Sequence, residues 1–238
     1  KTPIHDWHKK NNAKFEDVGQ WKRAWYYPSN KESMYDAVQR ESKAARTKAG
    51  ILDASTLGKI DIQGSDASEF LNRVYTNAWS KLPIGKCRYG LMLNEDGMVY
   101  DDGVTTRLDE NHYVMTTTTG GAANVLSKLE DYLQTEWPEL DVWLTSVTDQ
   151  YATASVCGPN SKKILKKLFP NVEFNDENFP HMSFKNAEMN GINCRIMRIS
   201  FTGELSYEIN IESKFGKSLW EKCIEAGKEF KITPYGTE

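Results

Sequence analysis

Residues 91–108, LMLNEDGMVYDDGVTTRL, carry the clearest fold signal in the sequence. Two strand-like runs flank the Asp96-Gly97 dipeptide, a pair of residues that strongly favours a β-hairpin turn. A third strand-like run follows at 111–118. Strands joined by short turns are antiparallel, so this stretch predicts an antiparallel sheet.

Strand-like and helix-like segments alternate on both sides of this hairpin. Further strands are expected within 51–64 and at 141–147, 151–157, 193–201 and 205–212. Helices are expected at 31–48, 65–76, 121–137, 160–168 and 216–228. Hairpins outnumber strand–helix–strand crossovers, so the pattern predicts an α+β fold. Residues 1–28 read as irregular and 170–190 as loop, and Ser29 and Asn30 are the candidate caps of the first long helix.

Composition excludes several classes of protein. The net charge is −3 with both signs interspersed, which argues against a nucleic-acid surface. No apolar run reaches the roughly 18 residues of a membrane span. The four cysteines are far apart in sequence, which suits a reducing, cytoplasmic compartment without a disulfide framework. The chain starts at Lys1, and we expect it to be a piece of a longer protein.

Two adjacent aspartates, Asp101 and Asp102, interrupt the second strand of the hairpin. Side chains alternate between the faces of a strand, and the parity that contains Tyr100, Asp102 and Val104 is the more apolar one. This parity predicts that Asp102 lies on the covered face and that Asp101 faces water. A carboxylate on a covered face is either bonded to backbone donors or held in a pocket to act on a ligand nitrogen or proton.

Four segments, in order, resemble the aminomethyltransferase family, the T-proteins of glycine cleavage and their relatives. The segments are TPIHDWHKKNNAKFEDVGQWKRAWYYP, GILDASTLGKIDIQGSDASEFL, LMLNEDGMVYDDGVT and RISFTGELSYEINI. The third is similar to the family pattern N-E-x-G-G-x-x-D-D, and the fourth to R-x-x-Y-T-G-E-x-G-x-E. Within the family, HDWH, GQWKR and TTTTGGAA most resemble the carboxy-terminal half of the alpha subunits of heterotetrameric sarcosine oxidases.

The resemblance implies a T-protein-like folate-binding fold. A ferredoxin-like domain, 51–144, would be inserted into a first domain made of 1–50 and 145–238. The family's carboxy-terminal β-barrel and a folate-binding arginine would lie beyond residue 238.

The same resemblance implies tetrahydrofolate-dependent one-carbon transfer. Tetrahydrofolate would capture the iminium or formaldehyde carbon from oxidative demethylation of sarcosine and form 5,10-methylenetetrahydrofolate. Asp102, at the second Asp of the family's pair, would be catalytic and would manage the proton at N5 or N10. FAD, FMN and NAD would belong to other domains or subunits, and the other sarcosine oxidase subunits would be partners.

Five further residues are implied as folate contacts. Glu208 matches the family's pterin anchor, and Glu204 is the second candidate. Tyr89 would lie against the folate, Leu57 would line an apolar pocket, and Tyr207 would either stack on the pterin or pack in the core. On strand parity Glu208 faces away from its apolar neighbours, so it lies on solvent or on a ligand face.

Departures from the family and alternatives to it also follow from the residues. The family's S-H-M-G is replaced by STLG, and the G-G before the aspartates is replaced by Gly97-Met98. His5 and His8 have no third ligand nearby in sequence, so no metal site is expected. No glycine-rich nucleotide fingerprint occurs. A folate-binding module without transferase chemistry and a scaffold for an oxidase complex remain the alternatives.

Overall fold

The computed structural model describes residues 1–238 and consists of two compact units. The first unit comprises Lys1–Thr56, Gln150–His181 and Lys185–Glu238, and the second comprises Leu57–Asp149 with Met182–Phe184. Both units mix helices and strands, which confirms the predicted α+β class, and neither sheet of five or six strands closes on itself.

A six-stranded sheet forms the centre of the first unit, with the strand order β10-β11-β12-β9-β3-β13. Strands β11, β12, β9 and β3 pair antiparallel, and β13 pairs parallel with β3. The strands are β3 (Gly50–Asp53), β9 (Tyr151–Cys157), β10 (Ser183–Met189), β11 (Ile192–Arg198), β12 (Ser206–Glu212) and β13 (Thr233–Pro234). Because β3 belongs to this sheet, residues 51–53 lie in the first unit. The inserted domain was predicted to span 51–144, and that domain division stays a proposal.

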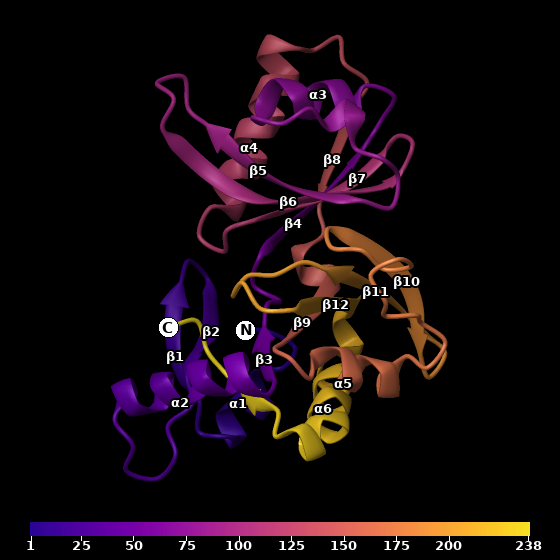
Figure 1. Ribbon diagram of the computed structural model, residues 1–238. Coiled ribbons are helices and arrows are strands. Elements are labelled where there is room, and N and C mark those ends of the chain that lie inside the picture. Colours follow the sequence, from indigo (N-terminus) through magenta and orange to yellow (C-terminus); the bar gives the residue numbers. More distant parts are fainter. The chain divides into compact units, whose positions relative to one another are not determined.

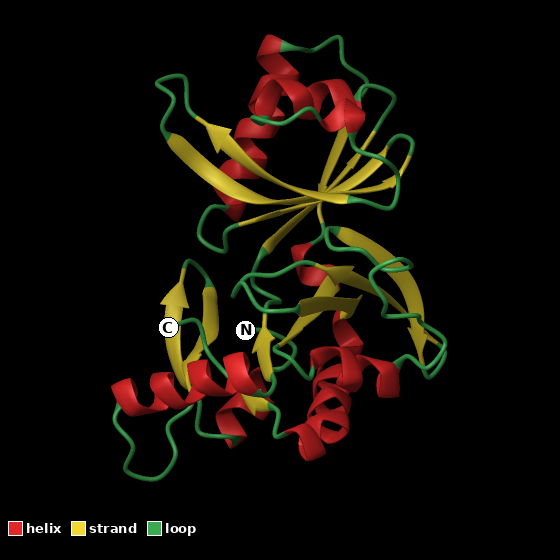
Figure 2. Ribbon diagram, in the orientation of Figure 1, coloured by secondary structure: helices red, strands yellow, loops and turns green.

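One face of the six-stranded sheet is apolar. Every second residue of β12, from Tyr207 to Ile211, is apolar and turns toward the same face. Helices α5 (Ser161–Leu168) and α6 (Gly216–Gly227) cover this face and complete the main core of the unit (Figure 2). The opposite face of β12 is therefore left to its polar residues.

The amino-terminal residues are more regular than predicted. They form α1 (His5–Lys10), a two-stranded hairpin of β1 (Lys14–Val18) and β2 (Trp21–Tyr26), and then α2 (Met34–Thr47). The prediction of an irregular 1–28 was wrong because both strands are short and mostly partly exposed, so they lack an apolar periodicity.

The cap of α2 also differs from the prediction. Ser33, rather than Ser29 or Asn30, caps the helix: its hydroxyl accepts a hydrogen bond from the Asp36 amide at 3.2 Å. Ser29 instead bonds the carboxylate of Glu32 at 2.9 Å.

The loop predicted at 170–190 contains the strand β10. This strand turns into β11 at Asn190-Gly191, where both residues have positive φ, 53° and 76°. Positive φ at both central residues is the requirement of a type I′ hairpin turn, and Asn-Gly is its preferred sequence. The turn signal was therefore present, but the polar sequence of β10, in which only the two end residues are buried, concealed the strand.

The second unit has a five-stranded antiparallel sheet with the order β5-β6-β7-β4-β8. Strands β6-β7-β4-β8 and helices α3 and α4 have the β-α-β-β-α-β arrangement of a ferredoxin-like fold, and β5 adds an edge strand. The elements are β4 (Gly58–Gln63), α3 (Ala67–Val74), β5 (Cys87–Leu93), β6 (Val99–Asp109), β7 (His112–Thr117), α4 (Ala122–Asp131) and β8 (Trp143–Ser146). Both helices lie on one face of this sheet (Figure 1) and enclose the core of the unit.

Five short helical turns complete the structure. They are Trp79–Lys81, the π-helical Tyr132–Glu136 that extends α4, Thr148–Gln150, Ser213–Phe215 and Lys228–Phe230. None of the helices combines the length and the apolar character needed to cross a membrane. All four cysteines are buried free thiols.

Candidate functional site

The two adjacent aspartates of β6 point to opposite faces of the five-stranded sheet. Asp101 pairs with Met92 of β5, which is part of the core under α3 and α4, and cross-strand partners share a face. Asp101 is accordingly only 5% exposed, whereas Asp102 is partly exposed on the face without helices. The parity prediction was wrong: Asp101 is the covered residue.

A β-bulge explains this reversal. Met92 pairs with Asp101, but the next residue of β5, Leu93, pairs with Val99, so Tyr100 is the extra residue. A bulge breaks the strict alternation of side chains along a strand. The apolar residues of β6 before and after the bulge therefore do not share one face. A count of alternating residues that runs through the bulge assigns the two aspartates to the wrong faces.

Asp102 and Tyr89 form a hydrogen-bonded pair on the face without helices. The Tyr89 hydroxyl donates to Asp102 Oδ2 at 2.8 Å. Tyr89 is 50% exposed, and its hydrogen bond to the carboxylate raises the pKa of its hydroxyl. A carboxylate beside an accessible phenol can accept a proton from a ligand nitrogen, and the aromatic ring offers a surface for a planar ligand.

Asp101 is held on the other face by the connection between β7 and α4. Its Oδ2 accepts a hydrogen bond from the Thr118 amide at 3.2 Å. Burial raises the pKa of Asp101, the hydrogen bonds with Thr118 oppose that rise, and the neighbouring charge of Asp102 adds to it.

Glu208 lies on the polar face of β12, opposite the core. It pairs with Ser155 of β9 and Met197 of β11, and it is only 6% exposed. Glu208 is therefore shielded from solvent, and its role as a ligand contact stays a prediction. The pKa of the Tyr235 hydroxyl is raised, mainly by burial and partly by the charge of Glu208.

Other buried polar residues surround Glu208 on this face. Thr153 donates from its hydroxyl to Asn210 Oδ1 at 2.7 Å, and the hydroxyls of Ser155 and Ser206 lie 3.3 Å apart. A buried polar face of a central sheet is costly unless its groups find partners. Such a face suits a polar ligand that presents several donors and acceptors.

Tyr207 packs in the core of the first unit. It is 1% exposed and makes edge contacts with the rings of Phe174 and Phe179 in the core under α5 and α6. It points away from Glu208, so the two side chains cannot share one ligand. This position agrees with the packing alternative.

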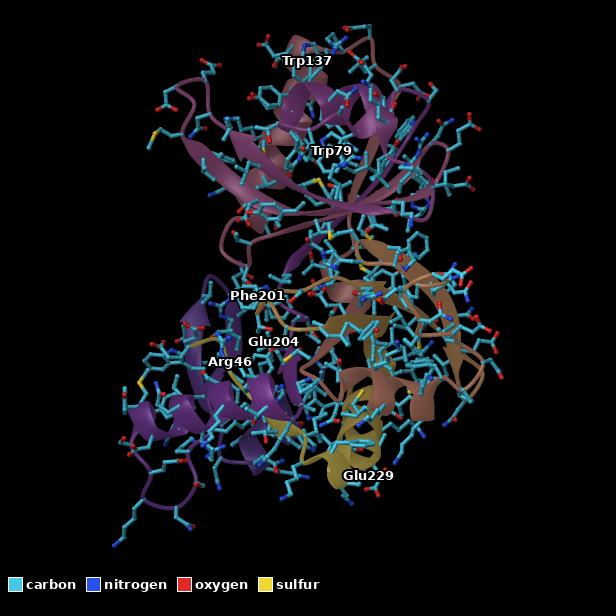
Figure 3. The ribbon with its side chains drawn as sticks, viewed as in Figure 1. Arg46, Trp79, Trp137, Phe201, Glu204 and Glu229 are labelled. Carbon is cyan, nitrogen blue, oxygen red and sulfur yellow. The ribbon has the colours of Figure 1, made fainter.

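Glu204 lies in the turn before β12, beside a small open cavity. Its carboxylate accepts a hydrogen bond from Arg46 Nη1 of α2 at 3.3 Å. The cavity has a volume of about 220 Å³ and includes Thr202, Tyr235 and the exposed Phe201 in its lining. Figure 3 shows Arg46, Glu204 and Phe201 close together in the first unit. No motif in the sequence indicated Arg46, because helix α2 carries several other charged residues at similar spacing.

Leu57 lies at the turn between β3 and β4. Its side chain is partly exposed, and its carbonyl oxygen accepts a hydrogen bond from Lys59 Nζ at 2.9 Å. The structure thus groups Asp102 with Tyr89 in the second unit, and Glu204 and Glu208 on β12 and its preceding turn in the first.

Comparison with known proteins identifies the family. The family model described as GCVT N-terminal domain matches residues 4–238. The chain therefore belongs to this family, as the four motifs predicted. It is 32% identical over 236 residues to an aminomethyltransferase of Thermoanaerobacter pseudethanolicus, covering 99% of this chain and 60% of that protein.

Sarcosine oxidase alpha subunits are more similar in sequence. Identity is 58% over 238 residues to that of Corynebacterium sp. (strain P-1), which covers all of this chain and 25% of the relative, and 48% to that of Rhizobium meliloti. The chain thus spans about a quarter of the length of these curated relatives. These similarities place it among enzyme domains.

Two solved structures share the fold. Aminomethyltransferase T of the glycine cleavage system from Bartonella henselae matches with a TM-score of 0.82 and 25% identity, over 99% of this chain and 59% of that one. A chain of the heterotetrameric sarcosine oxidase from Corynebacterium sp. U-96 matches with a TM-score of 0.58 at 14% identity, covering 82% of this chain and 93% of that one. The predicted T-protein-like fold is confirmed.

Proposed function

We propose that this chain is the tetrahydrofolate-dependent one-carbon transfer domain of a sarcosine oxidase alpha subunit. The observation that carries this proposal is the pairing of Asp102 with Tyr89 on an accessible sheet face, at the positions where the family motif has its catalytic aspartate and folate-contacting tyrosine. The sequence similarity to sarcosine oxidase alpha subunits supports the same function.

Asp102 is the proposed proton acceptor. A folate nitrogen attacks the electrophilic carbon, a C–N bond forms, and the proton of that nitrogen passes to the Asp102 carboxylate. Asp102 then passes this proton to the departing amine or hydroxyl: glycine leaves if the carbon arrives as the iminium of sarcosine, and water leaves if it arrives as formaldehyde. The second folate nitrogen closes the ring of 5,10-methylenetetrahydrofolate as its own N–H proton passes to solvent. The hydrogen bond from Tyr89 fixes the carboxylate for this step.

Glu208 is the proposed pterin anchor. The 2-amino group and N3 of a pterin present two adjacent N–H donors, which a carboxylate accepts with two parallel hydrogen bonds. Its burial at 6% exposure favours this role, because water competes little for hydrogen bonds to a shielded carboxylate. Glu204, whose carboxylate accepts a hydrogen bond from Arg46, is the second candidate.

Other parts of this proposal rest on similarity alone. The amine oxidation, with FAD, FMN and NAD, is assigned to other domains or subunits of a heterotetramer in the cytoplasm. Leu57 is assigned to the one-carbon side of the pocket, where it stands in place of the family's methionine.

The test is Asp102→Asn in the full-length alpha subunit assembled with its partners. Amide and carboxylate have the same shape, but the amide cannot take the proton, so we expect formation of methylenetetrahydrofolate to fall about 10²- to 10⁴-fold. Sarcosine consumption should be unchanged. The assay needs a formaldehyde-trapping amine in solution, so that carbon released to the buffer is not counted as enzymatic product.

Asp109→Asn, at the exposed end of the same strand, is the matched control and should retain both activities. Unchanged product formation in Asp102→Asn would contradict the catalytic role. If the wild-type complex itself loses the one-carbon unit to the trap and forms no methylenetetrahydrofolate, the result supports the scaffold function in place of one-carbon transfer.

A further inference from the structure

Asp101 is a buried carboxylate that the proposed chemistry does not use. It directly precedes Asp102 but lies on the opposite, helix-covered face, with only 5% of its surface exposed. A carboxylate in such a place lowers stability unless the structure compensates it. Its contacts therefore indicate what it does for the site.

The carboxylate reaches the beginning of helix α4. Its Oδ2 accepts the Thr118 amide at 3.2 Å, and the Thr118 hydroxyl accepts the Gly121 amide at 3.1 Å. A Cβ placed on Gly121 would lie 2.9 Å from Asp101 Oδ1 and 2.8 Å from the Thr118 hydroxyl. Real Cβ atoms essentially never come this close, so this approach requires glycine at position 121.

Helix α4 lacks a cap of its own. Gly121 is its N-cap residue and offers no side chain to the amides of the first turn, which have no partner within the helix. These amides and the aligned peptide dipoles favour a negative charge at that end of a helix. Asp101 supplies the charge from β6, and so links this strand to α4 across the core.

This link acts at the point where β6 is least regular. The bulge at Tyr100 immediately precedes Asp101, and the ladder to β5 resumes only at the pairing of Asp101 with Met92. A bulge re-aims the residues that follow it. The anchored side chain of Asp101 therefore determines how the backbone presents Asp102, whose carboxylate meets Tyr89 on the other face.

We propose that Asp101 is a positioning residue, which uses its contact with the Thr118–Gly121 turn to fix the orientation of Asp102 for one-carbon transfer. This inference rests on the proposed function. It also assigns Gly121 a specific part, namely the space that allows the carboxylate to approach α4.

Two variants of the full-length subunit, assembled with its partners, separate position from charge. Gly121→Ala displaces Asp101 but keeps its charge, whereas Asp101→Asn keeps the shape but removes the charge. Both should lower kcat for methylenetetrahydrofolate formation, measured in the presence of the formaldehyde trap, about tenfold. Gly121→Ala does so because small misplacements of a catalytic group are costly, and Asp101→Asn because a neutral amide holds the Thr118 amide less strongly than a carboxylate does. The KM for tetrahydrofolate should stay within about twofold, since neither residue is proposed to bind it.

The pH profile distinguishes positioning from a purely structural role. The titratable groups that interact with Asp101 are Asp102 and Tyr75, which follows α3 and stays neutral because burial raises the pKa of its hydroxyl. Burial raises the pKa of Asp101, and only its ionised carboxylate carries the charge that Asp101→Asn removes. The step that protonation of Asp101 adds to the kcat profile of wild type and Gly121→Ala should therefore be absent from Asp101→Asn.

Glu130→Gln, an exposed carboxylate on α4 itself, is the matched control and should change neither kcat nor the profile. Thermal unfolding and sarcosine oxidation report whether each variant is folded. Wild-type kcat in both folded variants, in a complex where Asp102→Asn is inactive, overturns the positioning role alone. If the wild-type complex forms no methylenetetrahydrofolate in the presence of the formaldehyde trap, the proposed function is overturned and this inference with it.

Discussion

Asp101 and Asp102 have the same chemistry and opposite surroundings. One is covered by helices and bonded to a backbone amide, and the other is partly exposed beside a phenol. The motif in the sequence identified the pair correctly, but strand parity assigned the two side chains to the wrong faces, because a bulge at Tyr100 cannot be read from alternation. On β12, strand parity correctly placed Glu208 and Tyr207 on opposite faces. It could not predict that Glu208 is buried, because that burial depends on tertiary contacts.

The burial of Asp101 gives stability a distinctive pH dependence. Its folded-state pKa is raised, so its contribution to stability is present at acid pH and is lost as pH rises through that value. Asp101→Asn has no carboxyl group to ionise at this position, so the variant does not lose this stability as pH rises. We expect the variant to unfold at an equal or higher temperature than wild type at pH 8, with the advantage shrinking toward pH 4. A destabilisation of the same size at both pH values would contradict this account and point to a lost hydrogen bond instead.

At the scale of elements, turn chemistry predicted more than periodicity did. The Asp96-Gly97 hairpin is confirmed: Gly97 has φ 81°, and the Asp96 carboxylate accepts the Met98 amide at 3.1 Å. The helices at 160–168 and 216–228 are also confirmed, because their apolar faces pack on the sheet. The strands that were missed are short, and most of their residues are partly or fully exposed, so burial left no pattern in their sequence.

The Asn190-Gly191 turn offers a test at this scale. Gly191 has φ 76° and open space around its Cα, so a methyl group there meets no neighbour and only the backbone is strained. Gly191→Ala should lower the free energy of unfolding by about 1 kcal/mol, as measured by urea denaturation. Ala187→Gly, within β10, is a useful comparison that tests strand propensity rather than the turn. No loss of stability in Gly191→Ala would mean that this hairpin does not have the described turn.

At the scale of the whole molecule, the chain supplies two sets of groups that the proposed folate chemistry uses. The first unit provides a buried carboxylate on a polar sheet face, and the second provides an accessible aspartate–tyrosine pair. The sequence alone predicted the family and the fold, because four ordered motifs cover nearly the whole chain. It could not predict what covers each side chain, which depends on contacts between segments far apart in sequence.

The central claim is that Glu208 anchors a pterin within these residues, and titration of tetrahydrofolate into the full-length subunit tests it most directly. We compare wild type with Glu208→Ala and with Tyr207→Phe, a neighbouring change in the core that should leave binding intact. Saturable binding by wild type and Tyr207→Phe, weakened at least 100-fold in Glu208→Ala, is the predicted result, since a charge-assisted bidentate contact contributes roughly 3 kcal/mol or more. Equal affinity in Glu208→Ala, or no binding by folded wild type, would contradict the account.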